Sequence, residues 1–134
     1  MSKKVKLKCC WPYLIVSNLE ENIAFFRDKL GFNVGLREPD IQFAMVGRDG
    51  VIILLRGSQH DPSVLVNAQF ERDAWPPGYE PYDLSIQVSD VDAYYRELVD
   101  RGASPRPPEN RPYGRDFGVT LPDGYDLVFL QLES

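Results

Sequence analysis

The chain has 134 residues, of which 43% are hydrophobic and 26% are charged, so its composition is that of one ordinary globular domain and excludes an intrinsically disordered chain. Twenty acidic and fifteen basic side chains give a formal net charge of −5. This charge argues against nucleic acids and membrane surfaces as partners, because both are anionic. No apolar run approaches the roughly 18 residues of a membrane span.

The N-terminal lysines precede no long apolar segment, so the sequence shows no secretory signal. The only two cysteines, Cys9 and Cys10, are adjacent, and neighbouring cysteines rarely form a disulfide because the resulting ring is strained. We therefore expect two buried, reduced thiols and a cytoplasmic protein.

The first half of the chain reads as a strand, a helix and three further strands. The apolar run Tyr13–Val16 predicts the first strand, Ser17 or Asn18 can cap the helix that follows, and Gly31 is placed to end it. The apolar helix face consists of Leu19, Ile23, Phe26 and Leu30. The further strands are expected at Asn33–Arg37, Ile41–Gly47 and Val51–Arg56, the last two joined by a tight turn at Asp49-Gly50.

The second half repeats this order. A strand at Leu84–Val88 precedes a helix that Ser89 or Asp90 caps and Gly102 ends. A short extended piece near Ser104–Arg106 and strands at Asp116–Leu121 and Tyr125–Leu132 complete it. Between the halves, His60 to Tyr82 is rich in proline and reads as an irregular linker.

Two short segments of the first half return in the second. Val16-Ser17-Asn18 reappears 72 positions later as Val88-Ser89-Asp90, and the turn Asp49-Gly50 reappears 74 positions later as Asp123-Gly124. Two matches in the same order indicate a duplicated unit. We therefore predict an α+β fold of two βαβββ modules that form a curved mixed sheet, in one domain over residues 1–134. The modules are expected at about 9–60 and 82–132, with the linker at about 61–81.

Three stretches resemble the glyoxalase, bleomycin-resistance and extradiol dioxygenase superfamily, also called the vicinal oxygen chelate superfamily. They are the first strand and helix from Pro12 to Phe32, the start of the second helix at Val88–Val91, and the end of the chain from Tyr113 to Tyr125. The last stretch is similar to the ending of bleomycin-binding proteins, so the resemblance is closest to that branch. It implies paired βαβββ modules, a homodimer and concave ligand clefts.

Metal-dependent members of that superfamily carry His, Gln or Glu ligands at four positions, which here correspond to Trp11, Arg56, Asp83 and the vicinity of Val128. Of these four side chains, only the Asp83 carboxylate is of a type that coordinates metal ions, and one carboxylate is too few to hold a catalytic metal. The positive charge of Arg56 also repels a cation. We therefore predict no metal and no other cofactor. An Asp83–Asp126 pair is the one alternative for metal or acid–base chemistry.

The sequence offers aromatic rings instead, and rings give a ligand a large, stiff contact area. The predicted ligand-binding residues are Trp11, Phe43, Arg56, Trp75, Tyr82, Asp83, Tyr113 and Phe117. The function favoured is metal-free binding of a small aromatic or cationic molecule, as in sequestration of a drug or metabolite. Two alternatives remain open: a metal-dependent lyase, isomerase or dioxygenase-like enzyme of the same superfamily, and an interaction or regulatory module without a small ligand.

Overall fold

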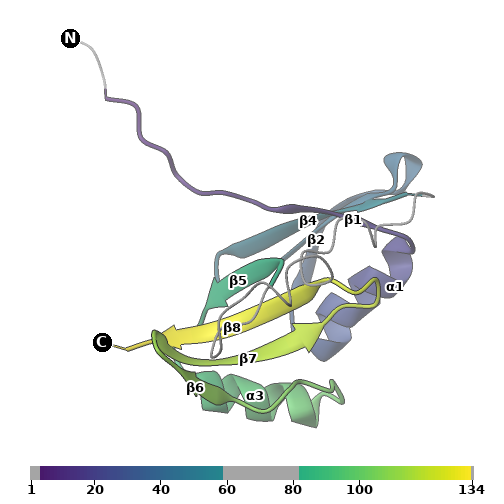
Figure 1. The fold of residues 1–134 in the computed structure, drawn as a ribbon. Helices are drawn as coiled ribbons and strands as arrows, with labels where there is room; N and C mark the ends of the chain where they lie inside the picture. The colour runs from purple at the N-terminus through teal and green to yellow at the C-terminus, as the bar shows by residue number, and fades with distance from the viewer. Residues whose placement is uncertain (1–3, 59–81, 134) are drawn as a thin grey trace.

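A computed structural model describes residues 4–58 and 82–133 (Figure 1). The first half contains the strands β1 (Tyr13–Val16), β2 (Asn33–Glu38), β3 (Phe43–Arg48) and β4 (Val51–Gly57), with helix α1 (Leu19–Ala24) and a π-helical turn, η1 (Phe25–Lys29), between β1 and β2. A 3₁₀ turn, η2 (Pro39–Ile41), separates β2 from β3. The second half contains β5 (Leu84–Gln87), α3 (Val91–Asp100), β6 (Glu109–Arg111), β7 (Gly114–Thr120) and β8 (Asp126–Leu132).

Each half builds its own four-stranded mixed sheet. The strand order is β1-β4-β3-β2 in the first sheet and β5-β8-β7-β6 in the second. In both sheets the strand before the helix runs parallel to the last strand, and the other neighbours are antiparallel. The predicted pair of βαβββ modules is therefore confirmed, and each module contributes one of two equivalent sheets.

The hydrophobic core lies between the helices and one face of each sheet. The apolar helix residues predicted from the sequence, including Ile23, Phe26 and Leu30, are all buried there. They share one contiguous cluster with the second half, to which Leu98 of α3 and Phe129 of β8 belong. Because this core buries the helix-facing side of each sheet, we look for a ligand-binding site on the opposite face.

Several element boundaries differ from the prediction. The start of α1 agrees with it, since Asn18, one of the two predicted caps, accepts a hydrogen bond from the Glu21 backbone N–H. Ile41 belongs to the η2 turn, so β3 begins at Phe43. The short extended piece predicted near 104–106 is instead the strand β6 at Glu109–Arg111, because these residues pair with the start of β7.

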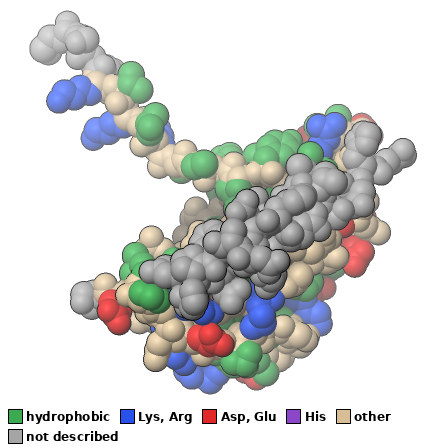
Figure 2. Space-filling model, viewed as in Figure 1, with side chains coloured by type: hydrophobic (Ala, Val, Ile, Leu, Met, Phe, Trp, Pro, Cys, Tyr) green, Lys and Arg blue, Asp and Glu red, His purple; other side chains and the backbone are tan. Residues whose placement is uncertain are grey.

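The expected burial of Cys9 and Cys10 is wrong. Both thiols are free and exposed, since the segment before β1 extends away from the body of the molecule (Figure 1). Apolar and lysine side chains alternate along this segment, and Val5 and Leu7 are almost fully exposed (Figure 2). Within the described ranges, no helix is long and apolar enough to cross a bilayer.

Candidate functional site

The strand face of the first sheet, opposite its helix, is apolar and open. Strand alternation places Tyr13 and Ile15 of β1 on this face, beside Leu54 of β4 and Phe43 of β3. The rings of Tyr13 and Phe43 lie 5.9 Å apart, centroid to centroid. Tyr13 is 53% exposed, and Figure 2 shows hydrophobic side chains gathered where β1 and β4 lie.

One cation lies among these apolar groups. Arg56 is opposite Ile15 on one side and opposite Phe43 on the other, so its exposed guanidinium shares their face. It forms no ion pair with any residue that the structure describes. Trp11, two residues before Tyr13, is 43% exposed and continues the same alternation. Three of the predicted ligand-binding residues, Trp11, Phe43 and Arg56, therefore share one strand face.

The strand face of the second sheet is polar. Asp126 is mostly buried and accepts hydrogen bonds from the Thr120 hydroxyl at 2.6 Å and from the Arg106 guanidinium at 3.3 Å. Arg106 also donates to the Thr120 hydroxyl at 2.7 Å. Its guanidinium lies directly on Gly118, where a Cβ atom would approach the Arg106 Nη2 to 2.2 Å. Because Gly118 has no side chain, the Arg106 guanidinium can lie over the middle of β7.

A second buried carboxylate, Asp116, lies on the neighbouring strand β7. Asp116 is fully buried and accepts a hydrogen bond from the Tyr113 hydroxyl at 2.7 Å and one from Arg111 Nε at 3.1 Å. Burial and this hydrogen bond to Asp116 raise the pKa of the Tyr113 phenol, so it stays protonated as a donor. Tyr82, which directly precedes Asp83 and β5, lies near enough to Tyr113 to interact with it electrostatically.

Of the four positions that would hold a metal, three carry side chains that do not bind metals, Trp11, Arg56 and Val128, and the fourth is Asp83. Val128 faces Ser85 across the parallel pair of β5 and β8. Asp83 directs a carboxylate oxygen to the Asp126 backbone N–H at 2.9 Å, so it caps the start of β8. Among residues 4–58 and 82–133, His, Cys, Asp and Glu side chains nowhere gather in a group of three that could hold a metal ion.

The predicted site residues thus divide into two groups of three and two exceptions. Trp11, Phe43 and Arg56 lie on the first sheet, and Tyr82, Asp83 and Tyr113 lie at the second. Trp75 lies outside the described residues, as does His60.

The prediction that Phe117 contacts a ligand does not agree with its burial. It is 1% exposed, and its ring packs against Tyr94, Tyr95 and Phe129 in the core. An odd-numbered position in β7 faces the helix, whereas its neighbours Asp116 and Gly118 face the other way. Phe117 is therefore not a ligand-contacting ring.

Sequence reasoning missed the charged residues of the second strand face. Asp116, Arg111 and Arg106 were not among the predicted site residues, although the polar alternation of Asp116, Gly118 and Thr120 along β7 was visible in the sequence. That alternation predicts a common face but not which arginines reach it, because both arginines come from outside β7.

Several solved structures are similar to this fold. The bleomycin-binding protein of Streptomyces verticillus, solved with copper(II)-bleomycin, has a TM-score of 0.72 at 23% identity, over 97% of this chain and all of that one. TnmS3, an antibiotic binding protein of Streptomyces sp. CB03234, has a TM-score of 0.69 at 23% identity with the same coverage. TioX of Micromonospora sp. ML1 has a TM-score of 0.65 at 20% identity, over 95% of this chain and 98% of that one.

No protein of curated function is significantly similar to this chain in sequence. The family model described as the Glyoxalase/Bleomycin resistance protein/Dioxygenase superfamily, however, matches residues 10–129. This range includes both described α-helices, the first sheet, and the second sheet up to Phe129 in β8. The chain therefore belongs to the glyoxalase/bleomycin resistance protein/dioxygenase superfamily.

Proposed function

We propose that this protein binds a small organic molecule on the strand faces of its sheets, without a metal, and so sequesters a drug or metabolite in the cytoplasm. The observation that carries the proposal is the exposed face of Tyr13, Phe43 and Arg56, the last of which forms no ion pair with a described residue. Rings and a single cation favour a planar ligand with a polar group. An arginine at a ligand position opposes a metal cation by charge repulsion.

The similar structures support the same kind of function. One of them is an antibiotic binding protein and another holds copper(II)-bleomycin. Metal-free bleomycin is therefore the first probe, followed by a panel of planar aromatic cations and anions. The acidic net charge of −5 favours the cations over longer distances.

The test is a fluorescence titration of protein dialysed against EDTA, in which ligand binding changes the emission of Trp11. Loss of the ring in Tyr13→Ala is expected to weaken a ligand stacked there by about 1–3 kcal/mol. Tyr113→Ala tests the second face in the same way. Arg27→Ala is the matched control for Arg56→Ala, since Arg27 is exposed and pairs, among the described residues, only with the adjacent Asp28.

Two outcomes would overturn the proposal. One is that no member of the panel binds until a divalent metal is restored, which would favour the metal-dependent enzyme. The other is binding that Tyr13→Ala, Tyr113→Ala and Arg56→Ala all leave as strong as in the Arg27→Ala control. Elemental analysis of the purified protein is expected to show no stoichiometric zinc, iron, nickel or manganese.

We also propose that the protein acts as a homodimer. The strand face around Tyr13 and Ile15 exposes apolar surface, and the segment that carries Val5 and Leu7 extends from the body with nothing packed on it among the described residues. A second copy would cover both surfaces and close the open face into a cleft. Sedimentation is expected to show a dimer at micromolar concentration, and a stable monomer would contradict this proposal.

A further inference from the structure

The internal repeat places the two halves in contact at two equivalent junctions. At each junction the hairpin turn of one half lies against the strand-to-helix connection of the other. The first junction brings the β7–β8 turn to the end of β1, and it is closed. Asp123 accepts hydrogen bonds from the Ser17 backbone N–H at 3.0 Å, from the Ser17 hydroxyl and from the Asn22 side-chain amide at 3.1 Å.

A tyrosine fills the rest of this closed junction. Tyr125 is 3% exposed, and its hydroxyl donates to the Ile15 backbone carbonyl at 2.8 Å. Ile15 belongs to β1, an edge strand of the first sheet. The phenol therefore satisfies an edge carbonyl that pairs with no other described strand, while its ring occupies the space beside it.

The second junction brings the β3–β4 turn to the end of β5, and it is open. The repeat puts Val51 where Tyr125 stands and Asp49 where Asp123 stands, and a pocket of about 390 Å³ lies between Val51, Gln87 and Ser89. Asp49 does not reach across it. Its side chain is 91% exposed, and its one ion pair with a described residue is to the adjacent arginine, with the carboxylate 3.7 Å from Arg48 Nε.

Turn length explains why one junction closes and the other does not. Two residues, Asp49 and Gly50, connect the paired Arg48 and Val51. Three residues, 122–124, connect Leu121 to Tyr125, whose carbonyl accepts the Leu121 N–H. The additional residue lets Asp123 project to the opposite half, and the shorter turn holds Asp49 away from it.

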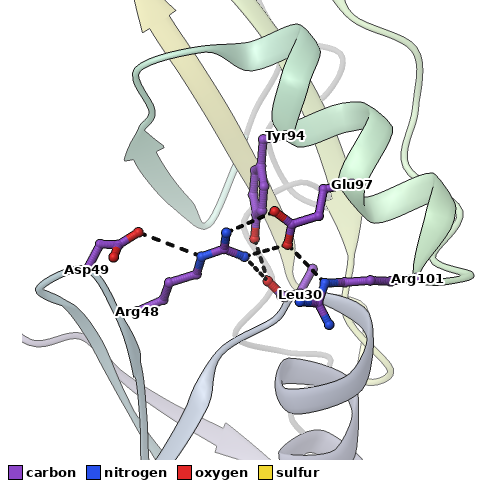
Figure 3. Close-up of polar contacts among 6 residues, drawn as sticks. All are labelled: Leu30, Arg48, Asp49, Tyr94, Glu97 and Arg101. Carbon is purple, nitrogen blue, oxygen red and sulfur yellow. Dashed lines mark hydrogen bonds and ion pairs between the residues drawn. The ribbon is translucent and has the colours of Figure 1, made fainter.

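One wall of the pocket is fixed by an ion pair between the halves (Figure 3). Arg48 donates to both carboxylate oxygens of Glu97, at 2.6 and 2.9 Å, and its guanidinium lies 5.1 Å from the centroid of the Tyr94 ring. The Tyr94 hydroxyl donates to the Leu30 backbone carbonyl at 2.8 Å, as does Arg48 at 3.2 Å. The pocket is therefore a preformed space, and the positive charge of Arg48 is neutralised within its wall.

The remaining charge at the pocket is negative. Asp49 and Asp90 both line it. Asp49 lies 3.7 Å from Arg48, whose guanidinium is already held more closely by Glu97, and Asp90 accepts the Ala93 backbone N–H but has no cationic partner among the described residues. The backbone of Gln87 faces the open edge of β5, because its neighbour Val88 bonds to β8 through the Leu130 carbonyl. Both features attract a hydrogen-bond donor with positive charge.

We propose that this pocket is a second binding site, separate from the strand faces, for a small aromatic ring that carries an ammonium group. The ring takes the place that the Tyr125 ring has in the closed junction, beside Val51. The ammonium group donates to the Gln87 carbonyl and lies near Asp49 and Asp90. The site does not depend on the function proposed for the strand faces.

Tyramine is the probe, because it joins a phenol ring to an ammonium group. Titration into the full-length protein, followed by amide chemical shifts, is expected to move the signals of Val51, Ser89 and Ala93 first. 4-Hydroxyphenylacetate, which has the same ring and an anionic group, is expected to bind at least tenfold more weakly, as is ethylamine, which has no ring.

The most informative variant places at position 51 the tyrosine that the closed junction has at position 125. Val51→Tyr is expected to fill the pocket and weaken tyramine binding at least tenfold, whereas Val99→Tyr, the same substitution on the exposed side of α3, leaves it unchanged. Ala93→Phe, at an exposed helix position that lines the pocket, supplies the second test if Val51→Tyr does not fold. The proposal fails if tyramine binds wild type and a folded pocket-filled variant equally, if its shifts map elsewhere, if it does not bind at all, or if the anion binds as well.

Discussion

The strand faces of the two sheets have the same architecture and opposite chemistry. On the first sheet, Tyr13 and Phe43 are accessible and Arg56 has no ion pair with a described residue. On the second, Asp116 and Asp126 are buried and each accepts hydrogen bonds from an arginine. A contiguous apolar surface that is left exposed typically marks a site that binds another molecule. The comparison indicates that the first face is specialised for contact and that the second also stabilises the fold.

The largest expected difference between the faces is in stability. Asp116→Ala removes a fully buried carboxylate and leaves Arg111, itself largely buried, without this partner. The expected loss in the free energy of unfolding is about 3 kcal/mol, as for other broken buried pairs. Arg56→Ala, on the exposed face, is expected to change stability by less than about 0.5 kcal/mol. Urea denaturation of both variants measures this, and equal losses would contradict the contrast.

A smaller difference is expected between two strand glycines. Gly118→Ala puts a methyl group into the space of the Arg106 guanidinium and displaces it from Asp126, with an expected cost of about 1 kcal/mol. Gly35→Ala in β2 is the matched control, since a Cβ there meets only ordinary contacts at 3.5 Å or more. The control is expected to be neutral or slightly stabilising. Equal thermal denaturation midpoints for the two variants would show that Arg106 does not depend on the glycine.

The smallest expected effect concerns the ion pair that joins the halves. The hydrogen bonds from Arg48 lower the pKa of Glu97 from its ordinary value of 4.5 to about 2. A lowered folded-state pKa stabilises the protein above the unfolded value, and this contribution is lost as the pH falls from about 4.5 through about 2. Wild type is therefore expected to lose up to about 1 kcal/mol more than Glu97→Gln over that range, a value reduced for partial solvent screening. Parallel urea curves at pH 5 and pH 2.5 test it.

The duplicated fold was predictable because it depends on local signals. Asp90, Gly31 and the apolar spacing from Leu19 to Leu30 each specify a helix end or a helix face without reference to distant residues. The site was predictable only in part. Strand alternation decides whether Phe117 faces the core or the ligand, and a strand boundary displaced by one residue reverses that assignment.

The charged cluster and the open junction depend on contacts that a single sequence does not reveal. Arg106 reaches Asp126 across 20 positions because Gly118 leaves it room, and a glycine in a strand does not by itself indicate which side chain uses the space. The sequence shows that Ser17 and Ser89 are equivalent positions of the repeat. Only the structure shows that Asp123 accepts hydrogen bonds from Ser17, whereas Asp49 does not reach across to Ser89.

The most direct test of metal-free binding on the strand faces is an amide chemical-shift map with the best ligand of the panel, recorded in EDTA. The largest shifts are expected at residues 13–15, 43–45 and 54–56 of the first sheet, with further shifts near Tyr113, and all are expected to appear without added metal. Shifts confined to the helices α1 and α3, or shifts that appear only after a divalent metal is added, would contradict the central claim.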